Sequence, residues 1–280
     1  MAMTARQFDS VRDLIYKSLG LHFEDAKLEY IDKRVEKRMV ALGMGRVDDY
    51  VFHLRFLDGE GAEMQALANL ITTNETYMFR EFDQLQAFAD HCLPEAIERR
   101  EKRGQRRLRI WSAGCSSGEE AYTLAIILRE VMHDADEWDI QILATDIDEV
   151  RLAMLREQVY GPYAVRDVPV EYAKRHLIQE GPETFRIAPE TARLVQSRHL
   201  NLCDRQAMRA LRDMDFVFCR NVLIYFDDAS RKTVVDHFYN CLNPGGFLYL
   251  GHAESVSRIS AAFTIRRVGP HLVYCKGRGS

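Results

Sequence analysis

Two short stretches of the chain carry residues that could bind a nucleoside. The first, Gly114-Cys115-Ser116-Ser117-Gly118, joins an apolar run to the strongly helical run Glu119–Val131. A glycine turn between a buried strand and a helix N-terminus presents backbone N–H groups to a ligand. The second is Asp146, which ends the apolar run 140–145, where a carboxylate can accept hydrogen bonds from both ribose hydroxyls. No Gly-Lys-Ser/Thr phosphate cradle accompanies the turn, so we expect a nucleoside and not a triphosphate.

The same turn also fits Gly-x-Ser-x-Gly, the nucleophile elbow of serine hydrolases. Ser116 would then be the nucleophile, and Asp215 and His252 are the downstream acid and base that a triad needs. In a hydrolase, however, strands precede the elbow, whereas a helical segment does here, and Asp146 would have no role. The serines could also simply cap the following helix. We favour nucleoside binding and keep the serine hydrolase as an alternative function.

Composition narrows the classes of protein to consider. The 280 residues suit one large domain or two smaller ones, and 47% hydrophobic residues can form a sizeable core. A formal net charge of −4 argues against a protein built to bind nucleic acid. Six cysteines without a Cys-x-x-Cys pair argue against a metal site and fit a reducing cytoplasm. Without a signal-like start or a membrane-spanning apolar run, we expect a cytoplasmic protein with no membrane insertion.

Residues 1–72 are predicted to form a small all-α domain. Apolar residues recur at helical spacing from Phe8 to Leu21, and a second helix is expected over Lys27–Leu42. Two further helices are expected over Tyr50–Leu57 and Glu63–Ile71. The second helix carries a dense group of basic residues, Lys33, Arg34, Lys37 and Arg38.

Residues 73–107 are predicted to be a polar linker followed by a connecting helix over Glu81–Arg99. The run Arg99–Arg107 that ends this segment is densely basic. We interpret it as a solvated helix end and loop, because charge runs usually face water.

Residues 108–280 alternate strand-like and helix-like segments, which predicts a mostly parallel sheet with crossover helices. Phe263–Val268 and His271–Lys276 flank Gly-Pro and predict a C-terminal antiparallel hairpin. A small β insert is expected near 177–197, where prolines and glycines interrupt the pattern. Its strands would be Thr184–Ile187 and Arg193–Val195, and the chain would return to the main sheet at residues 198–202.

Several motifs, in a fixed order, resemble those of one family. They are Asn74–Glu81, Ser112–Tyr122, Ala144–Asp148, Phe218–Phe226 and Gly251–Ser255. The order of strands, glycine turn, acid and terminal hairpin resembles the S-adenosylmethionine-dependent methyltransferase fold. The motifs themselves resemble the bacterial chemotaxis receptor methyltransferases of the CheR type, and the resemblance covers nearly the whole chain.

The resemblance implies methyl transfer from S-adenosylmethionine to glutamate side chains on the cytoplasmic helices of chemoreceptors. The products would be S-adenosylhomocysteine and glutamate methyl esters, which serve chemotactic adaptation. With Gly114 of the turn, it implies these cofactor-binding residues: Asn74, Thr76, Arg80, Glu120, Asp146, Asn201, Leu202, Arg220 and Asn221. It also implies that Tyr225 lies near the transferred methyl group.

The proposed reaction needs little acid–base chemistry. A glutamate carboxylate has an ordinary pKa of about 4.3 and is already ionised at neutral pH. The remaining work is positioning and exclusion of water, for which Arg80 and Tyr225 are the candidate catalytic residues. His252 and Glu254 invite interpretation as a catalytic pair, but this reaction needs neither, and we interpret them as structural. A non-catalytic module that senses S-adenosylmethionine is a further alternative.

Two expectations concern the substrate. The basic residues Lys33, Arg34, Lys37 and Arg38 could steer glutamate-bearing receptor helices. Some family members also bind a peptide at the receptor C-terminus as an added strand on the β insert, using a longer loop with Gly-x-Gly. Here the run 177–187 has one glycine, followed by Pro182, so we expect a member that does not depend on this tethering peptide.

Overall fold

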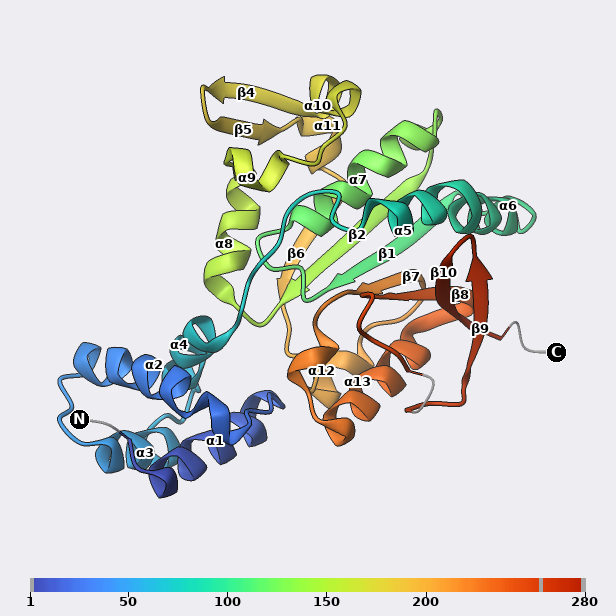
Figure 1. The fold of residues 1–280 in the computed structure, drawn as a ribbon. Coiled ribbons are helices and arrows are strands. Elements are labelled where there is room, and N and C mark those ends of the chain that lie inside the picture. The colour runs from blue at the N-terminus through green and yellow to red at the C-terminus, as the bar shows by residue number, and fades with distance from the viewer. Residues whose placement is uncertain (1–2, 257–258, 278–280) are drawn as a thin grey trace. The chain divides into compact units, whose positions relative to one another are not determined.

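The computed structural model describes residues 3–256 and 259–277, and the chain divides into two compact units (Figure 1). The helical unit comprises Met1–Thr73 and Leu223–Thr233, and the sheet unit comprises Asn74–Val222 and Val234–Ser280. No helix in the described ranges is long and apolar enough to cross a bilayer.

The helical unit confirms the all-α prediction for the N-terminal part of the chain. Its helices are α1 (Ala5–Leu19), α2 (Leu28–Ala41), α3 (Val47–Phe56) and α4 (Ala62–Ile71), with a 3-10 turn η1 (Asp25–Lys27) before α2. Thr4 begins α1 with a capping box, and Gly20, at φ 76°, ends it in the left-handed conformation. Phe8, Ile31 and Tyr50 are among the fully buried side chains that hold these helices together.

A buried carboxylate links three of these helices. Glu63 of α4 is 6% exposed and accepts hydrogen bonds from the Tyr50 hydroxyl at 2.7 Å and from Arg38 at 2.9 and 2.7 Å. Burial and the Glu63 carboxylate raise the pKa of Tyr50, and the same carboxylate raises the pKa of Arg38. Arg38 is therefore part of the packing of the unit, and removing it would leave a buried charge uncompensated.

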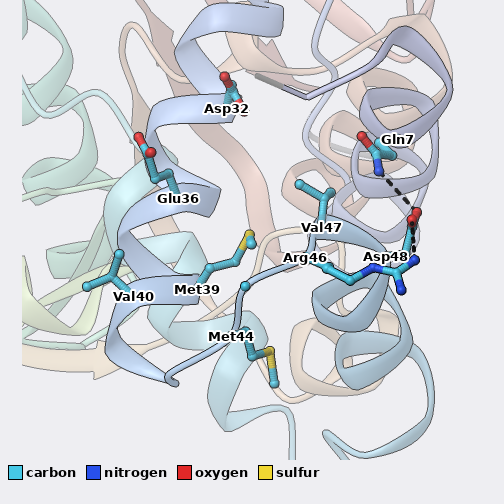
Figure 2. A pocket seen from close by; sticks show the side chains of 10 residues that line it. Gln7, Asp32, Glu36, Met39, Val40, Met44, Arg46, Val47 and Asp48 are labelled. Atoms are coloured by element: carbon cyan, nitrogen blue, oxygen red, sulfur yellow. Dashed lines mark hydrogen bonds and ion pairs between the residues drawn. The ribbon is translucent and has the colours of Figure 1, made fainter. Parts of the chain in front are cut away.

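A cavity of about 390 Å³ opens beside α2 in the same unit (Figure 2). The side chains that line it are Gln7, Asp32, Glu36, Met39, Val40, Met44, Arg46, Val47 and Asp48. Asp32 accepts from the Met3 amide, and Asp48 accepts from Gln7 and pairs with Arg46. None of the four basic residues predicted to dock the substrate lines this cavity.

The sheet unit contains a seven-stranded sheet in the order β6-β2-β1-β7-β8-β10-β9. The strands are β1 (Arg107–Ala113), β2 (Asp139–Asp146), β6 (Val195–His199), β7 (Met214–Cys219), β8 (Leu242–Leu250), β9 (Phe263–Val268) and β10 (His271–Lys276). The first five in the spatial order run parallel, and β10 runs antiparallel to both of its neighbours, β8 and β9. This confirms the predicted mostly parallel sheet with a C-terminal hairpin.

The helices of the sheet unit either precede β1, as α5 to α6 do, or follow the strands as the crossovers of a parallel sheet require. They are α5 (Phe82–Ala87), a π-helical segment η2 (Phe88–Cys92), α6 (Leu93–Glu101), α7 (Glu119–Val131), η3 (Ala135–Glu137), α8 (Glu149–Glu157), α12 (Arg205–Arg209) and α13 (Asp228–Cys241). The buried residues of β7 and β8 stack in aromatic pairs, with Phe218 and Tyr249 4.5 Å apart between ring centroids. Every residue of β7 is buried, as expected for a central parallel strand.

The β insert is confirmed, and so is its predicted strand Thr184–Ile187, which is β5. The insert is a three-stranded antiparallel sheet in the order β3-β5-β4, formed by β3 (Val159–Tyr160), β5 (Thr184–Ile187) and β4 (Leu177–Gly181). The short helices α9 (Pro162–Val165), α10 (Val170–His176) and α11 (Pro189–Ala192) flank these strands (Figure 1).

The prediction of an insert strand at Arg193–Val195 is wrong. Val195 begins β6 of the main sheet, because the Leu194 carbonyl already accepts from the Ile142 amide of β2 at 2.8 Å. The return to the main sheet at 198–202 is also too late, since β6 ends at His199. The Asn201 side chain then accepts from the Cys203 amide at 2.9 Å, which turns the chain away from the sheet.

The interpretation of the basic run 99–107 as solvated is wrong at Arg100. This side chain is buried and donates to both oxygens of Asp215, at 3.1 and 2.9 Å. Asp215 is fully buried and also accepts from the Arg109 amide and from Asn243. The pair ties α6 to the first residues of β7. The basic run therefore contains one buried residue, Arg100, whose charge is balanced by the buried carboxylate of Asp215.

Candidate functional site

The predicted nucleoside-binding residues gather at one edge of the main sheet. Because β1, β2 and β7 run parallel, their carboxyl ends lie at the same edge, and Gly114, Asp146 and Arg220 directly follow or end these strands. The strand order reverses direction at β1, with β2 on one side and β7 on the other. Ligands of open α/β sheets bind at such a switch point.

The glycine turn brings the backbone close to its neighbours. Gly114 has φ 78°, and a Cβ at this position would lie 2.4 Å from a γ-carbon of Val222. The Gly114 and Cys115 amides donate to the Thr145 carbonyl at 2.8 and 2.9 Å, which fixes the turn to the end of β2. Gly118, at φ 95°, faces Leu155 in the same way, with 2.5 Å from a built Cβ. Only glycine combines these dihedrals with this lack of space.

The Asp146 side chain holds the glycine turn by hydrogen bonds to backbone amides. Its carboxylate accepts from the Ser116 amide at 2.7 Å and from the Asp148 amide at 2.9 Å. The side chain is 8% exposed, and burial raises the pKa of Asp146, opposed by these two backbone hydrogen bonds. Ser116 itself has a positive φ of 50°, a strained conformation of the kind that occurs at functional sites.

Asn74 joins three segments that lie far apart in the sequence. Its amide nitrogen donates to Asp148 at 2.9 Å, and its amide oxygen accepts from the Ser116 hydroxyl at 3.2 Å. Asp148 also caps α8 by accepting from the Val150 and Arg151 amides. The linker, the glycine turn and the loop after β2 are thus connected by hydrogen bonds. Sequence reasoning missed Asp148, although an Asp immediately before a helix is a usual capping signal.

Glu120 and Arg220 form a buried ion pair beside the turn. The Glu120 carboxylate accepts from the Ser112 hydroxyl at 2.7 Å and from Arg220 at 3.2 Å. Burial raises the pKa of Glu120, and the nearby Arg220 charge opposes that shift. Within the described residues, Arg220 Nε is a buried donor without a hydrogen-bond partner. A buried unpaired N–H of a charged group is costly, so this atom is a candidate ligand donor.

The linker residues approach the same pair. The Arg80 side chain donates to the Glu75 carbonyl at 2.9 Å, and the Arg80 carbonyl accepts from Arg220. Phe79 and Glu81 on either side of it have positive φ values of 60° and 57°. Thr76, in the same linker, is half-buried.

A carboxylate that we interpreted as structural shapes the loops after β7 and β8. Glu254 accepts from three amides, those of Asn221 at 2.7 Å, Val222 at 2.9 Å and Gly251 at 2.8 Å. Asn221 has φ 61°, and a Cβ on Gly251 would lie 2.9 Å from the Asn221 amide nitrogen. Glu254 therefore holds Asn221 in place, and the spacing Gly-x-x-Glu after a strand was the available signal.

Of three other predicted site residues, two follow β6, whose carboxyl end lies at the same edge of the sheet as those of β1 and β2, and one lies in the helical unit. Asn201 and Leu202 follow β6, where Leu202 is buried and its carbonyl contacts His237 Nδ1 at 3.2 Å. Tyr225 ends the 3-10 turn η4 (Leu223–Tyr225) within the helical unit, and its hydroxyl donates to the Thr73 carbonyl at 3.3 Å.

The four basic residues of α2 separate into two pairs. Lys33 and Lys37 are exposed. Arg34 donates to the carbonyls of Leu70 and Tyr30 and stacks 3.4 Å above the Tyr30 ring centroid, while Arg38 pairs with buried Glu63. Only the lysines present their charge to solvent.

The geometry gives no support to a serine hydrolase. The Ser116 hydroxyl donates to Asn74, and Asp215 lies at the start of β7, at the opposite edge of the sheet from the turn. His252 is 61% exposed and its Nε2 lies 3.8 Å from Glu81. The three residues considered for a catalytic triad therefore contact other residues and not one another. Within the described ranges no cluster of side chains could hold a metal ion.

Two family models match the chain. One, described as "CheR methyltransferase, all-alpha domain", matches residues 6–72, and the other, "CheR methyltransferase, SAM binding domain", matches residues 74–269. "Chemotaxis protein methyltransferase 2" of Vibrio cholerae is 36% identical over 276 residues, which are 99% of this chain and 94% of that protein. "Chemotaxis protein methyltransferase" of Escherichia coli is 31% identical over 272 residues, or 95% and 90% of the two chains. That of Borreliella burgdorferi is 30% identical over 255 residues, or 91% and 89%.

Proposed function

Because the chain belongs to the CheR methyltransferase family, we propose that it methylates glutamate side chains on the cytoplasmic helices of chemoreceptors. It is an S-adenosylmethionine-dependent methyltransferase, as its relatives across nearly the whole chain are chemotaxis protein methyltransferases. The alternatives of a serine hydrolase and of a non-catalytic sensing module have no support from these relatives. The receptor glutamates and the cytoplasmic location belong to the proposal.

The residues at the sheet edge suit S-adenosylmethionine. The unpaired Arg220 Nε is a donor for an anionic group, and a side chain at Gly114 would fill the space beside Val222. Asp146 supplies carboxylate oxygens to the ribose, as the sequence predicts. The residues proposed to hold the cofactor are Asn74, Thr76, Arg80, Gly114, Glu120, Asp146, Asn201, Leu202, Arg220 and Asn221.

One observation supports a carboxylate as the methyl acceptor: the acidic side chains of the site already accept hydrogen bonds from neighbouring donors. Glu120 is held by Ser112 and Arg220, and Asp146 by two backbone amides, so both carboxylates are bound by donors. An amine or hydroxyl acceptor would need a base to remove a proton, whereas a glutamate arrives ionised. Bound S-adenosylmethionine supplies a methyl group on a positively charged sulfur. The residues of the chain then need to orient the acceptor and exclude water.

The proposal is tested by transfer of labelled methyl from S-adenosylmethionine to a receptor cytoplasmic fragment. We expect incorporation that mild base releases as methanol, because a carboxyl methyl ester is base-labile. A fragment with its candidate glutamates replaced by alanine is the control. Base-stable label, or equal label on the control, would contradict glutamate as the acceptor.

Arg80 and Tyr225 are proposed to act at the methyl-transfer end of the site. In Arg80→Ala and Tyr225→Phe we expect kcat to fall about tenfold or more, because small errors of alignment cost that much. Binding of S-adenosylhomocysteine, measured by calorimetry, should change much less. Equal losses of turnover and affinity would make both residues part of the binding pocket only.

Lys33 and Lys37 are proposed to steer the acidic receptor helices. Charge reversal in Lys33→Glu/Lys37→Glu should slow receptor methylation at low salt, and the difference from wild type should shrink as ionic strength rises. Rates are measured with receptor fragment well below saturation. Arg38 is excluded from the variant because it pairs with Glu63, so its reversal would disturb the fold.

Lys102→Glu/Arg103→Glu is the matched control for this experiment, since it reverses two exposed cations in the turn after α6. It should leave the methylation rate near that of wild type at every salt concentration. A defect of the lysine variant that does not depend on salt, or an equal defect in the control, would argue against steering.

The enzyme is also proposed to work without a receptor C-terminal tethering peptide. Pro182 and Glu183 alone connect β4 to β5, and Gly181 pairs directly with Thr184. A connection this short, with one residue that lacks an N–H, leaves little room to open beside an added strand. Titration with a peptide copying the receptor C-terminus should show no micromolar binding. Micromolar affinity, or loss of methylation after removal of the receptor tail, would refute this.

A further inference from the structure

Arg220 is held on three sides within the sheet unit. Its side chain is 4% exposed, and its terminal nitrogens donate to Glu120, Glu81 and the Arg80 carbonyl. The remaining donor, Nε, is buried and has no partner among the described residues. The three acceptors therefore fix the guanidinium through its terminal nitrogens and leave the Nε–H for a ligand.

Glu81 is the acceptor whose role the family motifs and the sequence analysis leave open. Its carboxylate lies 3.1 Å from Arg220 Nη2 and is 14% exposed. It adopts φ 57°, a left-handed conformation that is unfavourable for a non-glycine residue. Its carbonyl accepts from the Gln84 amide at 3.0 Å, so the same residue begins α5. The strained backbone directs a carboxylate to a buried arginine.

We infer that Glu81 is a positioning residue for the cofactor, acting by holding Arg220 so that its Nε stays available. Without Glu81, Arg220 would keep Glu120 on Nη1 and the uncharged Arg80 carbonyl on Nη2. Glu81 adds a charged acceptor on Nη2, so that each terminal nitrogen is held by a carboxylate and rotation of the planar group is limited. The inference concerns cofactor binding, so it does not depend on which acceptor is methylated.

Calorimetric titration with S-adenosylhomocysteine tests the inference on the full chain. Glu81→Ala should weaken binding about tenfold, the effect expected for loss of one charge-assisted hydrogen bond. Glu81→Gln keeps an acceptor oxygen without the charge and should weaken binding about threefold. Asp83→Asn removes one negative charge from an exposed position in the first turn of α5 and should change affinity less than twofold.

A double-mutant cycle separates positioning from a general structural role. In an Arg220→Lys background, Glu81→Ala should have little further effect on affinity, because the residue acts through the guanidinium. Melting temperatures of all variants are measured in parallel. Unchanged affinity in Glu81→Ala, an equal loss in both backgrounds, or Glu81→Gln as weak as Glu81→Ala would overturn the inference. If Arg220→Lys binds too weakly to measure, the order of the Ala, Gln and Asp83 variants still decides.

Discussion

Asp146→Ala is expected to weaken S-adenosylhomocysteine binding at least a hundredfold. Two charge-assisted hydrogen bonds to the ribose are worth about 1.5–3 kcal/mol each, and both are lost. The substitution also leaves the Ser116 and Asp148 amides, now bonded to the carboxylate, without an acceptor in a buried place. The glycine turn should therefore loosen as well. Calorimetry measures the affinity, and unchanged affinity would contradict the assignment of Asp146 to the ribose.

Asp146→Asn is the matched variant, because it keeps the size and one acceptor oxygen but removes the charge. Burial raises the pKa of Asp146, so the folded protein takes up a proton at a higher pH than a free aspartate does. The charged form is lost as pH falls through this raised pKa, and wild-type affinity should fall with it. Protonation of Asp146 itself favours the folded state in the same window, and the melting temperature measured at each pH separates weaker binding from unfolding. The Asn variant should bind more weakly but lack this pH dependence.

Gly114→Ala is expected to be the second large effect, on both stability and binding. The new Cβ would lie 2.4 Å from a γ-carbon of Val222, and the backbone φ of 78° is unfavourable for alanine. Overpacking and the left-handed conformation together should cost about 2–5 kcal/mol. The melting temperature and the affinity for S-adenosylhomocysteine should both fall sharply.

Two further variants identify the cause of that loss. Gly114→Ala/Val222→Ala removes the clashing γ-carbons and should recover part of the stability, but not the part due to φ. Gly161→Ala is the control, because Gly161 has φ −87° and nothing within 4 Å of a built Cβ. Full stability in Gly114→Ala, or no recovery in the double variant, would show that the Val222 contact is not the constraint.

The elements that the sequence predicts well are those with strong local signals. Hydrophobic periodicity predicts α1 to α4, and the glycine residues predict the turn between β1 and α7, where the proposed site lies. The acid after β2 follows from the same strand pattern. These features depend on residues that are close in the chain, so a single sequence contains them.

The contacts that the sequence does not predict join distant residues. Arg100 looks like one cation in a solvated run until Asp215, more than a hundred positions later, is placed beside it. Asn74, Asp148 and Ser116 meet only after the linker returns to the sheet edge. The sequence predicts β5 of the insert but not its partner β3, because two residues are too few to show any periodicity. These contacts and strands depend on residues that are distant in the sequence and not on local conformational propensity.

The two arginines and the two lysines on α2 should differ in how readily they can be substituted. Arg38 balances a buried carboxylate and Arg34 covers an aromatic ring, so exchange of either one carries a cost to folding. Lys33 and Lys37 are exposed, so their exchange should cost little folding stability. Under the proposed steering role, selection for a different receptor repertoire would act on the two lysines. An engineered change of substrate preference should therefore begin with them and keep both arginines.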